Sequence, residues 1–422
     1  MTRLSDFEQM WRDLTPIGRS ASSGGYFRQP WQAAELELRA WFREAAAARG
    51  LEVEEDPFGN LVAWWEVPDS SSSPAATDEA TGRTETPGAG AILTGSHLDS
   101  VLDGGAYDGP LGVVSSFAAL DLMRERGVQP SRRLGVAAFV EEEGSRFGRA
   151  CLGSRLAVGA TSWADARELT DRDGVRLGDV VEGLADGARS TLLDGVGTYV
   201  ELHVEQGRGL IDLGAPVGVH SAIWPHGRYR YDIAGRADHA GTTRMEDRVD
   251  PMLTYAMTAL AANKQARLQG QRATFGRIDV RPNGTNAVPS HVTAWLDARA
   301  ESDAALARLV GEIERQATER AERDGTTVAV TAESVSGEVA FDPALRDELA
   351  ARLGGVPVLP TQAGHDAGIL QDAGIPTAML FVRNPSGVSH SPYESAETAD
   401  CLAGVEALAD ALTGLVAAEV GA

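Results

Sequence analysis

Residues 95–112 have the sequence Gly-Ser-His-Leu-Asp-Ser-Val-Leu-Asp-Gly-Gly-Ala-Tyr-Asp-Gly-Pro-Leu-Gly, and this stretch separates a short apolar segment from a helical pattern. The apolar segment, 91–93, predicts a strand, and the apolar spacing over 111–126 predicts a helix. A continuous apolar run at 134–140 is typical of a buried parallel strand. Strand, crossover helix and strand form a βαβ unit, so we expect an α/β domain whose ligand site lies at the carboxyl ends of its strands.

The chain of 422 residues is long enough for two domains, and its pattern changes after about residue 214. An α+β module is predicted there, with strands at 228–234, 275–280 and 292–298 and helices at 251–268 and 304–323. Alternation of strands and helices resumes from about residue 328 and ends in a helix at 399–418.

We therefore predict a mixed, largely parallel sheet flanked by helices, formed by residues 1–216 and 330–422. An inserted α+β domain of antiparallel sheet and two helices is expected at 217–329. Residues 69–90 are a mixture of Ser, Thr, Pro, Ala and acids, which predicts a low-complexity surface loop.

Composition limits the class of protein. The formal net charge is −23, which disfavours nucleic acid and anionic membrane surfaces as partners. The chain has no apolar run near the roughly 18 to 20 residues of a membrane span, and its first residues lack a secretory signal. Cys151 and Cys401 are expected to be buried thiols in a reducing compartment. A soluble cytoplasmic protein is therefore expected.

The glycine-rich stretch holds two candidate metal ligands, His97 and Asp108, whose side chains can converge if the loop folds tightly. Asp99 is placed to fix the His97 imidazole from behind. Taken alone, the same pattern also fits a flexible acidic loop with an exposed histidine.

Three further pieces carry metal-ligand or acid/base residue types. Glu142 and Glu143 belong to a run of three acids directly after the strand at 134–140, where a solvated turn is the plain alternative. His203 lies in Glu-Leu-His-Val-Glu-Gln-Gly and His390 in Asn-Pro-Ser-Gly-Val-Ser-His-Ser-Pro-Tyr-Glu. Singly, these histidines also fit a core and a surface residue. Together, the pieces match the needs of a hydrolytic two-metal site.

From the Gly-Asn-Leu turn at residue 59 to the Ser-His-Ser-Pro turn, the motifs resemble those of one family of metal-dependent amidohydrolases. Its members are N-carbamoyl-L-amino acid hydrolase, allantoate amidohydrolase and yeast-type β-ureidopropionase, relatives of dinuclear aminoacylase and carboxypeptidase-like metallopeptidases. The resemblance implies two divalent ions per subunit, zinc or manganese, with nickel or cobalt also compatible. It assigns His97, Asp108 and His203 to the first ion, Asp108, Glu143 and His390 to the second, and the general acid/base role to Glu142.

The resemblance also implies substrate contacts by Gln206, His239, Asn286 and Arg299, with His239 polarising the scissile carbonyl as a catalytic group. The inserted domain is then a lid and dimerisation domain, and His239 usually comes from the partner subunit, which implies a homodimer. His365 and Asp366 are expected to support the ligands or position a loop.

The function expected on this basis is hydrolysis of a ureido C–N bond in a small carboxylate substrate, releasing ammonia and carbon dioxide. Allantoate and N-carbamoyl-L-amino acids are the candidates, with allantoate slightly favoured. One alternative is a dinuclear metallopeptidase or N-acyl amino acid deacylase of the same clan. His203 and the Glu-Gln-Gly sequence that follows it disfavour this alternative. Another alternative is a catalytically inactive binding protein on this fold.

Overall fold

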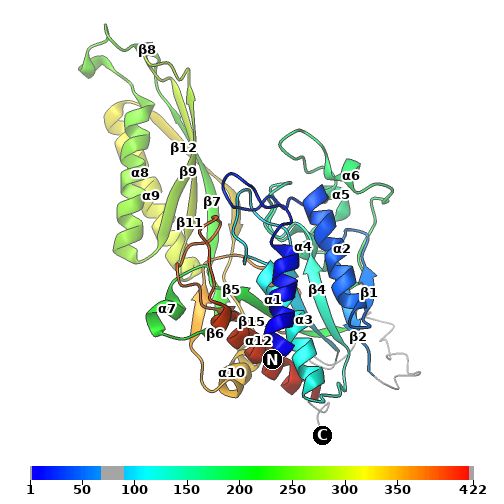
Figure 1. The fold of residues 1–422 in the computed structure, drawn as a ribbon. Coiled ribbons are helices and arrows are strands. Elements are labelled where there is room, and N and C mark those ends of the chain that lie inside the picture. Colours follow the sequence, from blue (N-terminus) through cyan, green and yellow to red (C-terminus); the bar gives the residue numbers. More distant parts are fainter. Residues whose placement is uncertain (1, 68–89, 418–422) are drawn as a thin grey trace, which may run out of the picture. The chain divides into compact units, whose positions relative to one another are not determined.

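The computed structural model describes residues 2–67 and 90–417, which form two compact units (Figure 1). The first unit comprises Met1–Ala222 and Ala340–Ala422, and the second comprises Ile223–Val339. The low-complexity segment predicted at 69–90 lies outside the described residues, apart from Gly90.

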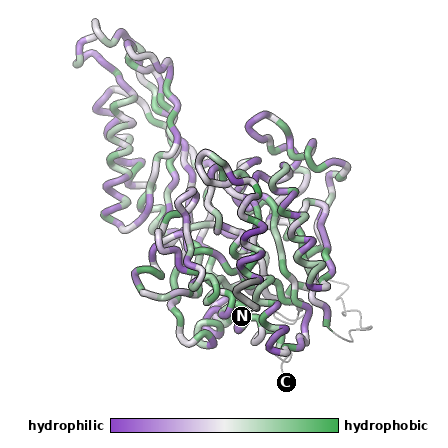
Figure 2. The backbone as a smooth tube through the Cα atoms, viewed as in Figure 1, coloured by the Kyte–Doolittle hydropathy of each residue, from purple (hydrophilic) through white to green (hydrophobic). Residues whose placement is uncertain are grey.

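The first unit is built on a mixed sheet with a parallel centre, as predicted. Its strand order is β1-β2-β4-β3-β5-β15-β6-β13, with β14 also paired to β6. Strands β4, β3, β5 and β15 run parallel, whereas β2 and β6 flank them antiparallel. The central strands are mainly hydrophobic (Figure 2). The strands are β1 (Glu52–Glu55), β2 (Leu61–Trp65), β3 (Ala91–His97), β4 (Leu134–Phe139), β5 (Val196–Val204), β6 (Val217–Ile223), β13 (Val339–Ala340), β14 (Val358–Thr361) and β15 (Thr377–Val382).

The helix predicted after the glycine-rich loop is α3 (Pro110–Glu125), the crossover between β3 and β4. Proline at its first position suits a helix start, and apolar residues all round it suit a buried helix. Its Phe117 packs against rings of α2. The other helices of this unit are α1 (Thr2–Leu14), α2 (Ala33–Ala47), α4 (Leu152–Ala157), α5 (Trp163–Ala166), α6 (Leu177–Val180), α7 (Gly209–Leu213), α10 (Pro343–Arg352), α11 (Asp366–Asp372) and α12 (Thr398–Ala417).

Strand β5 shows how the core positions the site. Val200, Leu202 and Val204 belong to the same hydrophobic cluster as residues of α3 and α12. Because successive side chains of a strand point to opposite faces, Glu201 and His203 lie on the other face of the sheet. The apolar face thus fixes the strand while its polar face carries the site.

The second unit is an antiparallel sheet, ordered β12-β7-β11-β9, with two long helices. Buried residues of β11 alternate with partly exposed ones, and they pack with α8 and α9 in one core. Both helices begin at a side-chain cap, Asp250 or Ser302, and end at a left-handed glycine. The elements are β7 (His226–Ala234), β8 (Asp238–His239), η1 (Met245–Asp247), α8 (Pro251–Gln269), β9 (Arg272–Arg281), β10 (Ala287–Val288), β11 (His291–Arg299), α9 (Asp303–Asp324) and β12 (Thr327–Ser336).

The bounds of this unit differ from the predicted 217–329. Strand β12 pairs with β7, so the segment in which the α/β pattern was expected to resume belongs to the smaller sheet. Strand β6 pairs with β15, so residues from 217 up to the unit boundary belong to the larger sheet. An amphipathic strand has the same local pattern in either sheet, and only its pairing partner decides.

Candidate metal centre

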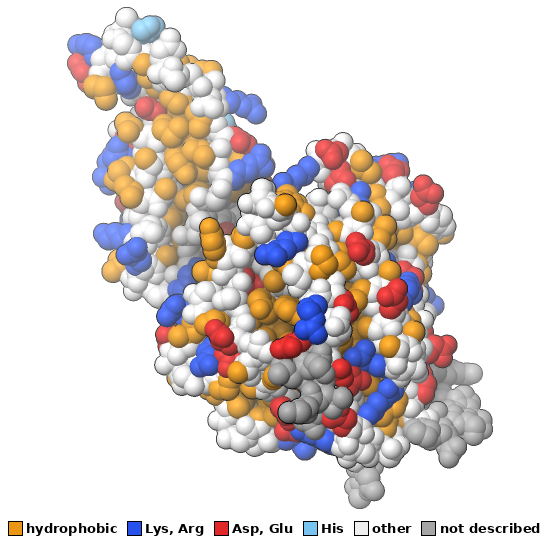
Figure 3. All heavy atoms as spheres, in the orientation of Figure 1, with side chains coloured by type: hydrophobic (Ala, Val, Ile, Leu, Met, Phe, Trp, Pro, Cys, Tyr) orange, Lys and Arg blue, Asp and Glu red, His pale blue; other side chains and the backbone are white. Residues whose placement is uncertain are grey.

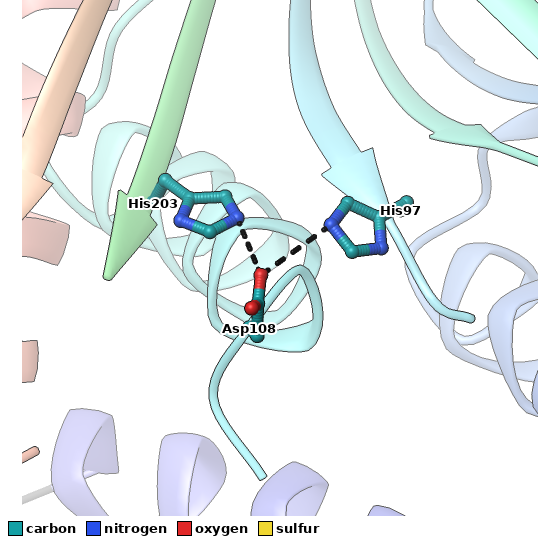
Figure 4. Close-up of side chains that lie close together, drawn as sticks. All are labelled: His97, Asp108 and His203. Carbon is teal, nitrogen blue, oxygen red and sulfur yellow. Dashed lines mark ion pairs between the residues drawn. The ribbon is translucent and has the colours of Figure 1, made fainter. Parts of the chain in front are cut away.

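Three side chains of the larger unit converge at the carboxyl ends of β3 and β5. His97 is the last residue of β3, Asp108 lies just before α3, and His203 is near the end of β5. Because β3 and β5 are adjacent parallel strands, these ends share one edge of the sheet. Oδ1 of Asp108 lies 3.1 Å from Nε2 of His203 and 3.8 Å from Nε2 of His97 (Figure 4). All three side chains are buried. The structure therefore brings together the residues predicted for the first ion.

A second group shares Asp108. Oδ2 of Asp108 lies 3.4 Å from Nε2 of His390, and the same nitrogen lies 3.4 Å from Oε2 of Glu143. His390 has a left-handed backbone with φ of 55°, which a non-glycine residue seldom adopts. The ligand atoms of each group lie within 4.8 Å of one another. Asp108 thus presents one carboxylate oxygen to each group, the arrangement that a bridging carboxylate needs.

Contacts on the far side of both imidazoles fix the ring nitrogen that carries the proton. Nδ1 of His203 donates to the backbone oxygen of Val204 at 2.8 Å, so its buried Nε2 is left to face Oδ1 of Asp108. Nδ1 of His97 lies 3.2 Å from the backbone oxygen of Asp99 and 3.4 Å from its Oδ1. Each Nε2 therefore faces the Asp108 carboxylate, a contact that needs either a proton on Nε2 or a cation between the two groups. Two imidazoles and a carboxylate are a donor set that fits a divalent metal ion.

The electrostatics of the site also favour positive charge. Burial raises the pKa of Glu142 well above its ordinary value, and burial with the nearby Asp108 raises the pKa of Glu143 to about 7. Burial opposes ionisation of Asp108, but its contact with His203 outweighs this and holds the pKa well below its usual range. Burial also lowers the pKa of His97, yet the Glu142 carboxylate raises it well above the ordinary value. Protons or metal ions therefore stabilise the cluster.

The consecutive acids after β4 point in different directions. Oε2 of Glu142 lies 3.6 Å from Nε2 of His97, and its Oε1 accepts a hydrogen bond from the thiol of Cys151 at 3.3 Å. Glu141 turns away, and its Oε1 accepts from the backbone N–H of Phe147 at 2.6 Å. Glu142 is therefore close to the first group without belonging to it, as an acid/base residue requires.

Two residues hold Asp108 from the other side. Gln206, predicted to bind substrate, donates from Nε2 to Oδ2 of Asp108 at 2.7 Å and to Oγ of Ser389 at 3.1 Å. Glu394, which the sequence analysis missed, accepts at Oε1 from the backbone N–H groups of Tyr107 and Asp108 at 2.8 and 2.9 Å. Its position four residues after His390 in the same motif was the available signal.

The expected supporting residues surround the ligands at different depths. Asp99 contacts an imidazole as described, and the ring centroid of His365 lies 4.6 Å from that of His203. Asp366 begins α11 and is fully buried. Glu201, another residue missed from the sequence, forms a further candidate ligand group with His203 and His365. It lies two residues before His203, so strand alternation places both on one face.

The remaining predicted residues belong to the second unit. His239 ends β8, and Asn286 lies beside it, since its backbone oxygen accepts from the N–H of the residue after His239 at 2.9 Å. Arg299 lies at the far end of β11 from His291 and contacts Asp297 at 2.9 Å. Within this unit, His239 and Asn286 come together, whereas Arg299 lies at the other end of β11. Their contact with substrate stays a prediction.

Comparisons with known proteins agree with this fold. An N-carbamoyl-L-amino acid amidohydrolase of Geobacillus stearothermophilus is 35% identical over 95% of this chain and 96% of its own. An allantoate amidohydrolase of Escherichia coli K12 is 31% identical over 92% of each. The crystal structure of a hydantoinase/carbamoylase family amidase from Burkholderia multivorans matches with a TM-score of 0.81 and 26% identity, over 98% of this chain and 99% of that one.

The fold and the relatives together show that the chain is a hydrolase that acts on carbon–nitrogen bonds. The model of peptidase family M20/M25/M40 matches residues 93–414, well over half of the sequence, so the chain belongs to that family. The resemblance inferred from the motifs is thereby confirmed. The family is typically dependent on two metal ions, and this chain carries candidate ligand groups for them. No helix in the parts described, 2–67 and 90–417, has the length and apolar character to cross a bilayer.

Proposed function

We propose that the chain is a dinuclear-metal amidohydrolase that cleaves the ureido C–N bond of a small carboxylate substrate and releases ammonia and carbon dioxide. The position of Asp108 carries the proposal, because its two oxygens face separate groups of ligands. The relatives reported above are named for allantoate and N-carbamoyl-L-amino acids, substrates that combine a ureido group with a carboxylate.

In this proposal, His97, Asp108 and His203 hold one divalent ion, and Asp108 shares the other with Glu143 and His390. Zinc or manganese suits these ligands, and nickel or cobalt is also compatible. The bound ions supply a water of lowered pKa and polarise the carbonyl group. The orienting contacts behind the imidazoles keep their lone pairs aimed at the site.

Glu142 is the proposed general acid/base. It takes a proton from the attacking water and delivers it to the departing nitrogen. Its raised pKa favours holding that proton between the two transfers. The Cys151 thiol contacts Oε1 of Glu142, and the His97 imidazole faces its Oε2. Both contacts limit the directions in which the Glu142 side chain can point.

Substrate recognition is assigned to Gln206, His239, Asn286 and Arg299. Arg299 offers a planar fork to the substrate carboxylate, while His239 and Asn286 polarise the scissile carbonyl. The eight residue steps of β11 between His291 and Arg299 span about 26 Å at roughly 3.3 Å each. His239 and Asn286 lie next to the end of β11 at which His291 stands. A small substrate cannot bridge that length, so we propose that the pair and Arg299 serve sites of two different copies.

A homodimer through the second unit follows from this division of labour. Helix α8 carries a stripe of exposed apolar side chains at helical spacing, namely Leu253, Met257, Leu260 and Leu268, exposed by 44%, 44%, 65% and 70%. Figure 3 shows hydrophobic side chains on the surface of this unit. Burial of such a stripe stabilises association by roughly 25 cal/mol per Å² of apolar surface. Pairing of two copies is the proposed use.

Ammonia release from a substrate panel tests the proposed activity. Purified protein supplied with manganese or zinc is assayed with allantoate, several N-carbamoyl-L-amino acids, an N-acyl amino acid and a dipeptide. Turnover of a ureido substrate is expected, with allantoate as first candidate and N-carbamoyl-L-amino acids as second. A Glu142→Gln variant, purified identically, controls for contaminating enzymes. Turnover of the dipeptide or N-acyl substrate alone would instead indicate a peptidase or deacylase. If the metal-loaded protein turned over none of these substrates, a binding protein would be indicated.

A further inference from the structure

The carboxylate of Glu394 lies at the junction of two loops that carry ligands from opposite ends of the chain. It is buried, with 6% exposure. Its Oε1 accepts from the backbone N–H groups of Tyr107 and Asp108, which are 287 and 286 residues away in sequence. One oxygen therefore fixes the two consecutive peptide groups on either side of Tyr107.

The second oxygen of Glu394 reaches the other loop. Oγ of Ser389 lies 3.3 Å from Oε2 of Glu394 and 3.2 Å from Oδ2 of Asp108. Ser389 directly precedes His390, whose backbone is in the left-handed region. Glu394 thus connects the backbone of the Asp108 loop to Ser389, the residue next to His390. Ser389 in turn contacts the Asp108 side chain, so both loops are held together at two points.

Gly105 leaves the space that this carboxylate occupies. A Cβ atom at residue 105 would lie 2.3 Å from both Cδ and Oε1 of Glu394, well inside contact distance. The φ of Gly105 is outside the left-handed region, so alanine can adopt this backbone. Substitution to alanine would therefore act mainly by displacing Glu394.

We propose that Glu394 is a positioning residue that sets the relative position of Asp108 and His390, and thereby the affinity of the ion they share. The inference rests on the proposed metal centre. Glu394 acts through hydrogen bonds to two backbone N–H groups and a hydroxyl. A glutamine side chain has the same length and keeps one oxygen for the two N–H groups, while its amide NH2 can donate to the Ser389 hydroxyl oxygen, so glutamine should replace the carboxylate. Residues that orient metal ligands typically change affinity by roughly 10- to 100-fold when they are removed.

Metal affinities of Glu394 variants test this inference. Competition with a chromophoric chelator gives the affinities of both zinc or manganese ions for the wild type and for E394A, E394Q and the exposed control E397Q. E394A should bind the ion shared by Asp108 and His390 about 10- to 100-fold less tightly. E394Q and E397Q should remain close to wild type, because glutamine retains the accepting oxygen and the reach. Unchanged affinity in E394A, or equal loss in E394Q, would overturn the proposal.

The Gly105→Ala variant supplies an independent perturbation that leaves Glu394 in the chain. As a single variant, G105A should lower the affinity for the same ion by about tenfold or more. Combined with E394A, it should add little, because two changes acting through one group are not additive. Losses that multiply in the double variant would contradict the assigned role. A wild type that binds fewer than two ions would instead refute the proposed metal centre itself, so the two failures are distinguishable.

Discussion

Gly109 precedes α3 and allows the chain to pass directly beneath the His97 imidazole. Its φ of 84° and ψ of −61° lie in a region that L-residues avoid. A Cβ atom there would lie 2.4 Å from Cε1, 2.5 Å from Nδ1 and 2.7 Å from Nε2 of His97. Substitution to alanine should therefore strain the backbone and push a proposed metal ligand out of place.

The size of the effect of G109A follows from these contacts. The backbone strain costs about 1 to 3 kcal/mol, and overpacking against the buried ring adds about 1 to 3 kcal/mol. Ordinary carbon contacts are about 3.5 to 4.0 Å, so the ring must move by roughly 1 Å. We expect the metal-free protein to lose about 2 to 6 kcal/mol of unfolding free energy and metal affinity to fall about 10- to 100-fold.

Gly127 offers a matched control, because its φ is 73° and a Cβ atom there would have nothing within 4 Å. G127A should cost about 1 to 2 kcal/mol of stability and leave metal affinity unchanged. Chemical denaturation in excess chelator measures stability, and chelator competition measures metal affinity. Equally tight binding of both ions by G109A and G127A would show that Gly109 does not keep His97 in place.

Three further substitutions test other parts of the account. Glu142→Gln should retain both ions by elemental analysis and lose about 10²- to 10⁴-fold in kcat, whereas loss of metal would mean that Glu142 is a ligand. Burial raises the pKa of Asp366 to about 8, so the folded state holds a proton that the unfolded state has released, and the unfolding free energy of metal-free protein should fall as pH rises from about 4 to about 8. D366N should flatten that slope in denaturation curves taken across this range, and an unchanged slope would rule Asp366 out as its source. Leu260→Glu, on the exposed stripe of α8, should shift sedimentation from dimer to monomer at micromolar concentration, and a persistent dimer would move the interface elsewhere.

The clustering of the candidate ligands was predictable because each of them occupies a locally recognisable place. His97 ends an apolar strand, Glu143 follows one, and His390 lies in a turn after another. Parallel strand ends meet at one edge, so residues far apart in sequence were expected to meet. The observed clusters contain the residues predicted for each ion.

Other features depend on long-range contacts, which a local pattern does not specify. Glu394 belongs to the same motif as His390, but the motif does not reveal that its carboxylate accepts from a backbone N–H 286 residues away. Strand β12 was assigned to the wrong part of the fold for a similar reason, since hydrogen-bonding partners decide the sheet to which an amphipathic strand belongs. Glu201 could have been found, because its spacing from His203 places both side chains on one face of β5.

The most direct test of the two-metal centre is the anomalous diffraction of crystals grown with zinc or manganese. Two peaks per subunit are expected, one on either side of the Asp108 carboxylate. One should contact His97 and His203, and the other Glu143 and His390. A single peak, or a peak held by Glu201, His203 and His365 in place of either, would contradict the account.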